Sequence, residues 1–262
     1  MKINIHAGHN PDGKIASGAV GLIKESTQAR KVKTKVISLL KEAGHTVYDC
    51  TVANGTSQSD VLNKIIKKCN AHDVDIDVSI HFNSGRNDKK GDGSIGGTEV
   101  LLYSDTSKAS DEAKRVLKKI NALGFKNRGI KIRKDLYYLK NTKAPAMLIE
   151  CCFVDDKDDV KLFDVNKMAK AIAEGITGKS LSTAKKETSG TFEDIVEKKK
   201  NNDFKVKVTC DVLNVRKGAG TNHDVVKRIR KNEVFTIVET KGDWGKLKSG
   251  AGWINLKYTK KV

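Results

Sequence analysis

Apolar and polar residues alternate in several short runs along the first 176 residues. The run KINIHA places Ile3, Ile5 and Ala7 on one side, as a half-buried β-strand does. Residues 26–44, STQARKVKTKVISLLKEAG, instead repeat apolar positions every three or four residues and stop at Gly44. That spacing is typical of an amphipathic helix. The two patterns predict a strand followed by a helix.

The same patterns continue through this part of the chain. Further strands are predicted at 45–52, 74–80, 98–104 and 146–154, and further helices at 59–70 (with Ser59 as N-cap), 110–123 and 166–176. Strands that alternate with helices predict an α/β domain. We expect a mostly parallel twisted sheet flanked by helices, with AMLIECCFV as a central strand.

The pattern changes after residue 176. Residues 177–203 are polar and Lys-rich, and only Phe192, Ile195 and Val196 suggest a short helix there. Residues 204–262 hold short β-type runs separated by Gly and Asn, which predict a small all-β barrel. The expected organisation is a domain at 1–176, a linker at 177–203 and a barrel at 204–262.

Charge adds a hint about partners. The chain carries a net charge of +18, of which residues 1–176 contribute +8 (30 Lys and Arg against 22 Asp and Glu) and residues 177–262 contribute +10 (20 against 10). An excess of this size favours an anionic partner, although a solubilising surface explains scattered lysines equally well. With 5% aromatic residues and no interleaved basic and aromatic positions, nucleic acid is not the expected partner.

Five cysteines at irregular spacing, without a CxxC pair, argue against a disulfide framework and against a structural zinc knuckle. The N-terminal run MKINIHAGHN has no apolar core of a signal peptide, and no stretch reaches the length of a membrane helix. We therefore expect reduced thiols, synthesis in the cytoplasm without a standard export signal, and no membrane insertion.

Candidate chemistry gathers where predicted strands end. His9 follows the first strand, His81 ends VDIDVSIH and Glu150 lies late in AMLIE, while Glu25 opens the first helix. Ligands of open α/β sheets lie outside the carboxyl ends of the strands. Two imidazoles and a carboxylate suit a three-ligand zinc site with an open fourth position, and a second carboxylate suits a general base.

Each of these residues alone also has an ordinary explanation. A histidine at a strand end is often packed, and Glu25 could be a first-turn carboxylate favoured by the helix dipole. Glu150 is harder to explain in this way, because the apolar stretch AMLIECCF should hold a carboxylate only with a partner: a cation, a functional role or an ion pair.

The joint order of INIHAGHN, KES, VSIHFN, NRGIK and LIECCF resembles the zinc-dependent N-acetylmuramoyl-L-alanine amidases of the amidase-3 type. The resemblance covers about residues 1–176. It implies that His9, Glu25 and His81 bind zinc and that Glu150 is catalytic. Four positions depart from the family pattern: Asn10 replaces a glycine, Phe82 a small residue, and Cys151 and Cys152 each a small residue.

Two further residues of this part are candidates for substrate binding. Asn83 is expected to shape the site, and Arg128 to pair with a stem-peptide carboxylate, unless it is a plain surface arginine. We expect His6 either to contact one of the metal ligands without binding the metal itself or simply to pack in the strand.

The tail, with LNVRKGAG and GWINLKY, resembles a bacterial SH3 domain, which implies binding of cell-wall peptide or its crossbridge. The candidate wall-binding residues are Asn214, Arg216, Trp244 and Tyr258, whereas Trp253 is expected in the barrel core.

Together the resemblances imply a peptidoglycan hydrolase that cleaves the amide between N-acetylmuramic acid and L-alanine, with release to the wall through a holin or other lysis. A monomer and a dimer are both compatible with the sequence. Two alternatives stay open: a cysteine-dependent wall peptidase using Cys151 or Cys152 beside His81, and a non-catalytic protein that binds the wall or nucleic acid.

Overall fold

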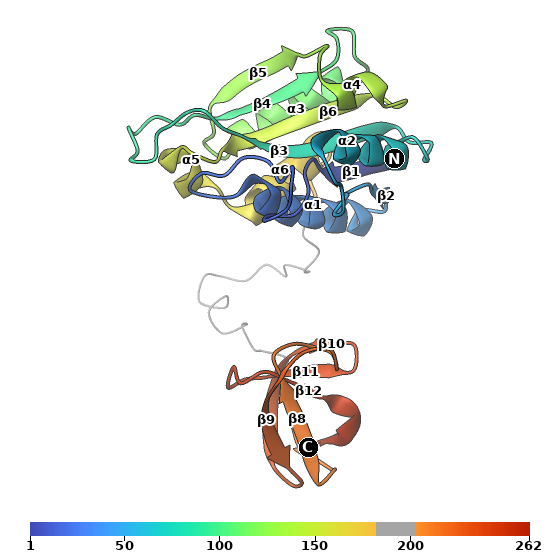
Figure 1. The fold of residues 1–262 in the computed structure, drawn as a ribbon, viewed down its shortest axis with the longest axis vertical. Coiled ribbons are helices and arrows are strands. Elements are labelled where there is room, and N and C mark those ends of the chain that lie inside the picture. Colours follow the sequence, from blue (N-terminus) through green and yellow to red (C-terminus); the bar gives the residue numbers. More distant parts are fainter. Residues whose placement is uncertain (182–202) are drawn as a thin grey trace. The chain divides into compact units, whose positions relative to one another are not determined.

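The computed structural model describes residues 1–181 and 203–262 (Figure 1). The chain divides into two compact units, Met1–Ala184 and Lys185–Val262, which we describe separately. The apolar triplet at Phe192, Ile195 and Val196 lies outside the described residues. No helix among the described ones combines the length and the apolar composition of a membrane span.

The first unit is built on a six-stranded sheet in the order β2-β1-β3-β6-β4-β5. Its strands are β1 (Lys2–Ala7), β2 (Thr46–Asp49), β3 (Ile76–Asn83), β4 (Thr98–Leu102), β5 (Asn127–Ile132) and β6 (Ala146–Phe153). The pairs β2–β1, β1–β3, β3–β6 and β4–β5 are parallel, and β4 pairs antiparallel with β6. The predicted mostly parallel sheet with a central β6 is confirmed; β5 was not predicted.

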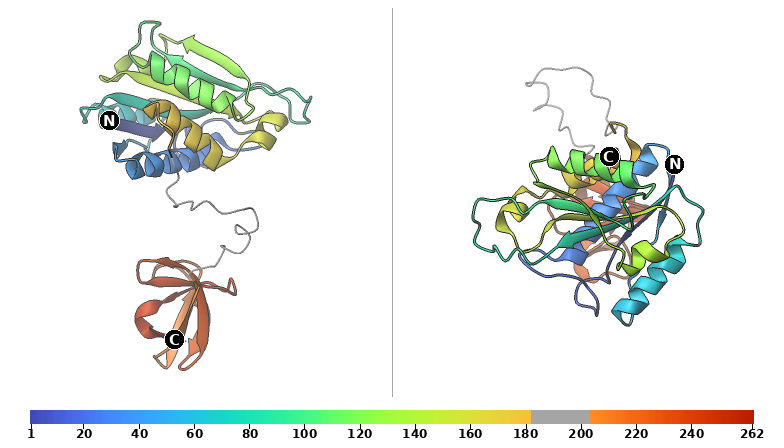
Figure 2. Two further views of the ribbon diagram at one scale, coloured as in Figure 1. Left: turned by 180° about the vertical axis from the view of Figure 1, so that it is seen from behind. Right: turned by 90° about the horizontal axis from the view of Figure 1, so that it is seen from above.

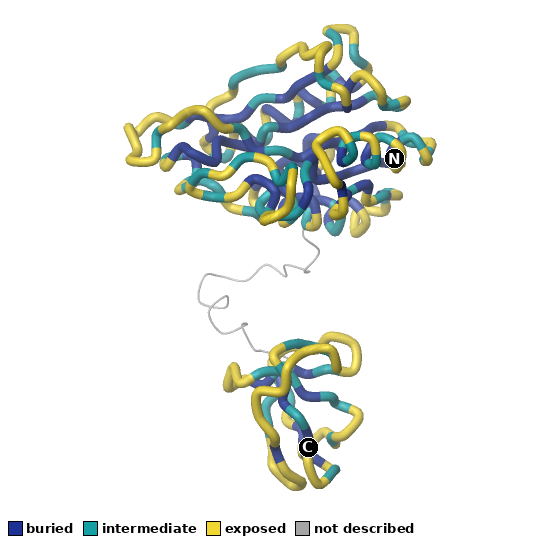
Figure 3. Tube along the Cα trace, in the orientation of Figure 1, coloured by how far each residue is buried: buried dark blue, intermediate teal, exposed yellow. Residues whose placement is uncertain are grey.

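Helices cover both faces of this sheet. Viewed from behind, α1, α3 and α6 all lie on the near side (Figure 2), and their apolar residues share one core with the sheet. Side chains from α2 and α4 form a smaller core on the opposite face. The helices are α1 (Glu25–Glu42), α2 (Gln58–Cys69), α3 (Ser110–Asn121), α4 (Tyr137–Asn141), α5 (Lys157–Leu162) and α6 (Val165–Thr177). Buried residues accordingly run along the central strands (Figure 3).

The predicted cap of α2 is wrong by two residues. Ser57, not Ser59, is the N-cap, and its hydroxyl accepts a hydrogen bond from the Asp60 backbone N–H at 3.1 Å. Ser59 lies inside the first helical turn. From there its side chain cannot accept a hydrogen bond from the free backbone N–H groups at the start of the helix, as an N-cap side chain does.

The packed part of the first unit continues past residue 176. Helix α6 ends at Gly178, which has φ +67°, a left-handed conformation that favours glycine. The chain then turns back, so that Leu181 is buried in the main core and its N–H donates to Glu174 Oε1 at 3.1 Å.

The second unit is all-β, as predicted. Its seven strands pair antiparallel in the order β13-β7-β10-β11-β12-β8-β9 around a core of eight buried apolar residues. The elements are β7 (Phe204–Val208), β8 (Val212–Arg216), β9 (Val225–Arg230), β10 (Val234–Lys241), β11 (Trp244–Leu247), β12 (Trp253–Asn255), a 3-10 turn (Leu256–Tyr258) and β13 (Thr259–Lys261).

Candidate metal centre and active site

Strand register brings the predicted residues to one edge of the sheet. Ala7 pairs with Ile80 across β1 and β3, so that the chain leaves β1 beside His81. His81 pairs in turn with Glu150 on β6, and Glu150 with Glu99 on β4. Because β1, β3 and β6 run parallel, the ends of β1 and β3 deliver His9 and His81 to the same place as Glu150.

Three side chains meet at this edge with the spacing of a metal site. Glu25 Oε1 lies 3.3 Å from His9 Nε2 and 3.0 Å from His81 Nδ1, and the three candidate ligand atoms all lie within 4.8 Å of one another. Ligand atoms bound tetrahedrally to zinc at 2.0–2.1 Å are separated by about 3.3 Å. The two separations from Glu25 are close to this value, so His9, Glu25 and His81 form a candidate metal site.

Glu25 is held ready as an anion. Its carboxylate accepts hydrogen bonds from the N–H of Ala19 at 2.7 Å and of Phe82 at 3.2 Å. Burial alone would raise its pKa, but the hydrogen bonds from His81 and His9 hold the pKa well below its ordinary value. The cluster thus contains a carboxylate that stays charged and two imidazoles that face it.

Two glycines leave room for the cluster, and sequence reasoning did not single them out. A Cβ on Gly8 would lie 1.9 Å from His81 Nε2, and one on Gly18 would lie 2.5 Å from Glu25 Oε2 and 2.7 Å from His9 Cδ2. Gly18 also has φ +79°. The one signal in the sequence was the position of Gly8 directly before His9.

The loop that carries His9 is fixed from two sides. Arg30 on α1 donates to the His9 carbonyl at 2.7 Å. The Asn10 amide donates to the carbonyls of Ile15 and Gly55, both at 2.8 Å, and its Oδ1 accepts from the Gly55 N–H at 3.1 Å. Asn10, the departure from the family pattern, therefore ties the loop to the segment before α2.

Glu150 lies beside the cluster with an unsatisfied oxygen. Its Oε2 is buried and has no hydrogen-bond partner among the described residues. Burial, together with repulsion from Glu25 and Glu99, raises its pKa to about 8, while Arg133 acts in the opposite direction. A carboxyl group that gains and loses a proton near neutral pH suits a general acid and base.

A cavity of about 230 Å³ opens next to these residues. Its polar lining includes His9, His81, Glu150 and Arg133, and its apolar lining includes leucines together with Tyr137 and Tyr138. His6 also lines it and packs edge-on against Tyr138; burial lowers the pKa of His6 to about 3, so its ring is neutral.

The structure places Asn83 and Arg128 on Glu99 rather than in the lining of this cavity. Asn83 Nδ2 donates to Glu99 Oε1 at 3.0 Å, and Arg128 Nε donates to Glu99 Oε2 at 2.9 Å. The Arg128 guanidinium also lies over the Phe153 ring, 5.0 Å from its centroid. Both residues thus hold the carboxylate that neighbours Glu150.

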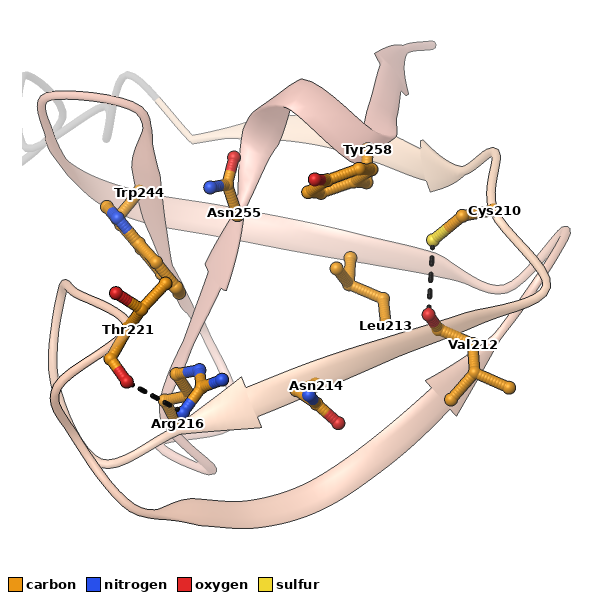
Figure 4. A pocket seen from close by; sticks show the side chains of 9 residues that line it. All are labelled: Cys210, Val212, Leu213, Asn214, Arg216, Thr221, Trp244, Asn255 and Tyr258. Carbon is orange, nitrogen blue, oxygen red and sulfur yellow. Dashed lines mark hydrogen bonds between the residues drawn. The ribbon is translucent and has the colours of Figure 1, made fainter.

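The second unit gathers its predicted residues in one place. Asn214, Arg216, Trp244 and Tyr258 all line a cavity of about 330 Å³ (Figure 4). Cys210, Val212, Leu213, Thr221 and Asn255 complete the lining. Trp253 lies outside it, half-buried, with the Lys246 ammonium 5.9 Å from its ring centroid.

Comparison with known proteins decides the family. Residues 3–178 match the N-acetylmuramoyl-L-alanine amidase family. The chain belongs to this family. Residues 211–260 match the bacterial SH3 domain, which confirms the predicted character of the second unit.

Similar proteins include an endolysin of Bacillus phage SPP1, 32% identical over 94% of this chain and 92% of the phage protein. An uncharacterized protein of Clostridium perfringens strain 13 is 34% identical over 69% of this chain, which spans about half (53%) of that relative. Among solved structures, the catalytic domain of an endolysin targeting Clostridia difficile is 28% identical with a TM-score of 0.62, over 69% of this chain and 98% of that one. The catalytic domain of an N-acetylmuramoyl-L-alanine amidase from Bacillus (Paenibacillus) polymyxa var. colistinus is 29% identical with a TM-score of 0.54, over 68% and 96%.

The residues by which this amidase departs from its family pattern do not line the cavity. Phe82 packs against Phe163 with ring centroids 5.1 Å apart, and Cys151 and Cys152 are fully buried in the main core. Burial raises the pKa of both thiols well above the ordinary value, so neither forms the thiolate that a cysteine peptidase requires. The cysteine alternative therefore lacks a nucleophile at this site.

Proposed function

We propose that this peptidoglycan amidase hydrolyses the amide between N-acetylmuramic acid and L-alanine with a zinc ion held by His9, Glu25 and His81, and with Glu150 as general base and acid. One observation carries the proposal. His9 Nε2 and His81 Nδ1 lie 3.3 Å and 3.0 Å from Glu25 Oε1, beside a cavity whose lining includes Glu150.

Each residue then has a defined task. Zinc held there supplies positive charge, which lowers the pKa of bound water and of nearby acids and polarises a substrate carbonyl. Glu150 accepts a proton from the attacking water and gives it to the nitrogen of the leaving L-alanine. Glu99 is held in place by Asn83 and Arg128. Its negative charge beside Glu150 helps to raise the pKa of Glu150.

The ligand assignment is tested by His81→Ala. We expect the purified variant to lose both bound zinc, measured by elemental analysis, and the release of peptides with a free N-terminal alanine from walls. His45→Ala is the matched control, because His45 lies between α1 and β2 and contacts the N-terminal amine instead. Stoichiometric zinc and full activity in His81→Ala would show that the site is misassigned.

The role of Glu150 is tested by Glu150→Gln, which keeps the shape of the side chain. We expect the variant to bind zinc normally and to lose turnover by about 10²-fold or more, as loss of a general base typically does. Treatment of the wild type with iodoacetamide should leave its cleavage of small soluble muramoyl peptides intact, and a chelator should abolish this cleavage. Unchanged cleavage by Glu150→Gln would exclude the proton-transfer role.

We further propose that the second unit binds the wall through the cavity lined by Trp244 and Tyr258. Arg216 is the single charged side chain in its lining, and its Nη1 donates to the carbonyls of Thr221 at 3.1 Å and His223 at 2.8 Å. The cavity thus offers aromatic rings and uncharged polar groups, which suit a short neutral peptide. Contacts with anionic polymer would fall to the lysines outside it.

Cys210 provides a native reporter for this cavity. The other four cysteines are buried, whereas Cys210 is partly accessible and lines the cavity. We expect wall peptides to slow the labelling of Cys210 by a thiol reagent, and Trp244→Ala to weaken both this protection and sedimentation with walls. Trp253→Ala should weaken neither. Equal protection in both variants would place the binding site elsewhere.

The similarity to a phage endolysin along nearly the whole chain supports synthesis in the cytoplasm followed by release to the wall during lysis. Induced expression in a susceptible host should leave the culture density unchanged until the membrane is permeabilised. Lysis without permeabilisation would contradict this route.

A further inference from the structure

One cation lines the catalytic cavity. Arg133 follows β5 and lies in the same lining as His9, His81 and Glu150. About half of its side chain is exposed, with a relative accessibility of 46%, so that it lies at the rim and not in the interior. Tyr137, which is also half exposed, lines the same rim.

The Arg133 guanidinium is oriented but not saturated. Asp135 accepts from its Nε at 2.9 Å and from its Nη2 at 2.8 Å, a bidentate pair that fixes the plane of the group. Among the described residues no acceptor contacts Nη1. The two N–H donors of Nη1 are therefore available to a ligand in the cavity.

The other charged groups at the cavity and at the sheet edge beside it are acidic. Glu99 and Glu150 are paired across β4 and β6, Glu25 on α1 contacts His81, and the second arginine of the region, Arg128, is engaged with Glu99 and Phe153. Without Arg133, the protein groups at the cavity would repel an anionic substrate. An arginine at such a rim selects for a carboxylate, which it binds with planar, charge-assisted hydrogen bonds.

We propose that Arg133 binds a free carboxylate on the residue that follows L-alanine in the stem peptide, so that the enzyme prefers acidic stems over stems amidated at that position. This inference rests on the proposed amidase function. The substrate then spans the cavity, with the scissile amide at the metal cluster and the carboxylate at the rim.

The experiment compares two soluble substrates that differ in one group, N-acetylmuramoyl-L-alanyl-γ-D-glutamyl-L-lysine and its counterpart with D-isoglutamine in place of D-glutamate, in both of which the γ-carboxyl is bound in the amide to lysine. For the zinc-loaded full chain we expect kcat/KM to favour the acid by about 10-fold or more, the effect of one charge-assisted hydrogen bond. Arg133→Gln should bring the ratio close to one, mainly by raising KM for the acid. Arg133→Lys should retain part of the preference.

Lys134→Gln is the matched control, because it removes the same charge from the neighbouring exposed position, which does not line the cavity. It should keep the wild-type ratio. A wild type that cleaves both substrates equally well would overturn the inference and leave the amidase function standing. An equal loss on both substrates in Arg133→Gln would show a structural role instead. Cleavage of neither substrate by the wild type would count against the proposed function itself.

Discussion

At the scale of single residues, two glycines beside the candidate metal ligands, Gly8 and Gly18, matter as much as the ligands themselves, because they have no side chain. The His81 ring occupies the space that a Cβ on Gly8 would take, and in this position its Nδ1 lies 3.0 Å from Glu25 Oε1. Gly18 gives the same clearance to Glu25 and His9. Residues that orient metal ligands commonly change metal affinity by 10-fold to 100-fold when they are mutated. The two glycines belong to that class although they donate nothing to a metal.

Gly8→Ala should therefore weaken zinc binding without altering any ligand. Its Cβ would fall 1.9 Å from His81 Nε2, so the imidazole must move by an ångström or more and lose its place beside Glu25. We expect zinc affinity, measured by competition with a chelating dye, to fall by about 10-fold or more.

Gly175→Ala is the matched control for this change. Its Cβ would meet the Val116 backbone at 2.5 Å, between α6 and α3 and away from the site. It should lower the melting temperature while zinc affinity stays at the wild-type value. Wild-type zinc affinity in Gly8→Ala would show that the ring has room that the structure does not indicate.

The convergence of His9, Glu25, His81 and Glu150 could be predicted, because the position of each in the sequence already indicates where it lies in the fold. His9, His81 and Glu150 end or interrupt apolar strands, and Glu25 begins a helix, so a sheet edge was their natural meeting place. Arg133 could not be predicted in this way, because it follows a strand that the sequence did not reveal. Glu99 was hidden for another reason: only the antiparallel pairing of β4 with β6 places it next to Glu150.

At the scale of elements, a buried polar contact joins β1, β3 and α2. Asn4 Nδ2 donates to Asp77 Oδ1 at 2.7 Å and to the Cys69 carbonyl at 2.9 Å, and both side chains are fully buried. The alternation of these strands was predicted, but the second face of the sheet is buried as well, beneath α2 and α4. The helix α4 escaped prediction because it has only 5 residues. The strand β5 escaped because, at the edge of the sheet, its residues do not alternate between buried and exposed.

Asp77 should make stability depend on pH. Burial raises its pKa from 3.8 to about 6, although hydrogen bonds from Asn4 and Cys69 oppose the shift. Between pH 4 and 6 the folded protein retains a proton that the unfolded chain loses, so the free energy of unfolding falls as pH rises through this window and levels off above it. The total is at most about 3 kcal/mol for a shift of this size.

Urea titrations of the wild type and of Asp77→Asn at several pH values between 4 and 7 measure this contribution. The variant has no proton to lose at this position, so its stability should fall less across the window. The comparison concerns the slope, because absolute stability also reflects how the new amide fits beside Asn4. Identical slopes in the two proteins would show that Asp77 is ionised normally in the fold.

At the scale of the whole molecule, each unit has the parts of an independent domain. The first unit contains all three residues of the candidate metal site (His9, Glu25 and His81) and a core that includes Leu181, and the second has a separate core of its own. The described residues 203–262 carry 14 Lys and Arg against 6 Asp and Glu, a net charge of +8 in 60 residues. The change in hydrophobic periodicity along the chain predicted two domains. The burial of Leu181 in the first core could not be predicted, because it depends on a turn after α6 that has no sequence pattern.

Residues 1–181 and 203–262, produced separately, should divide the activity between them. The first fragment should cleave small soluble muramoyl peptides at the full-chain rate, because every residue of the metal cluster and its cavity lies within it. It should act more slowly on whole walls, since tethering through the second unit raises the local concentration of substrate.

The second fragment should sediment with walls and cleave nothing. Part of that binding should weaken as salt is raised, because exposed charges are screened over about 8–10 Å at physiological ionic strength. A first fragment that matches the full chain on walls, or a second fragment that fails to sediment at any salt concentration, would refute this division of labour.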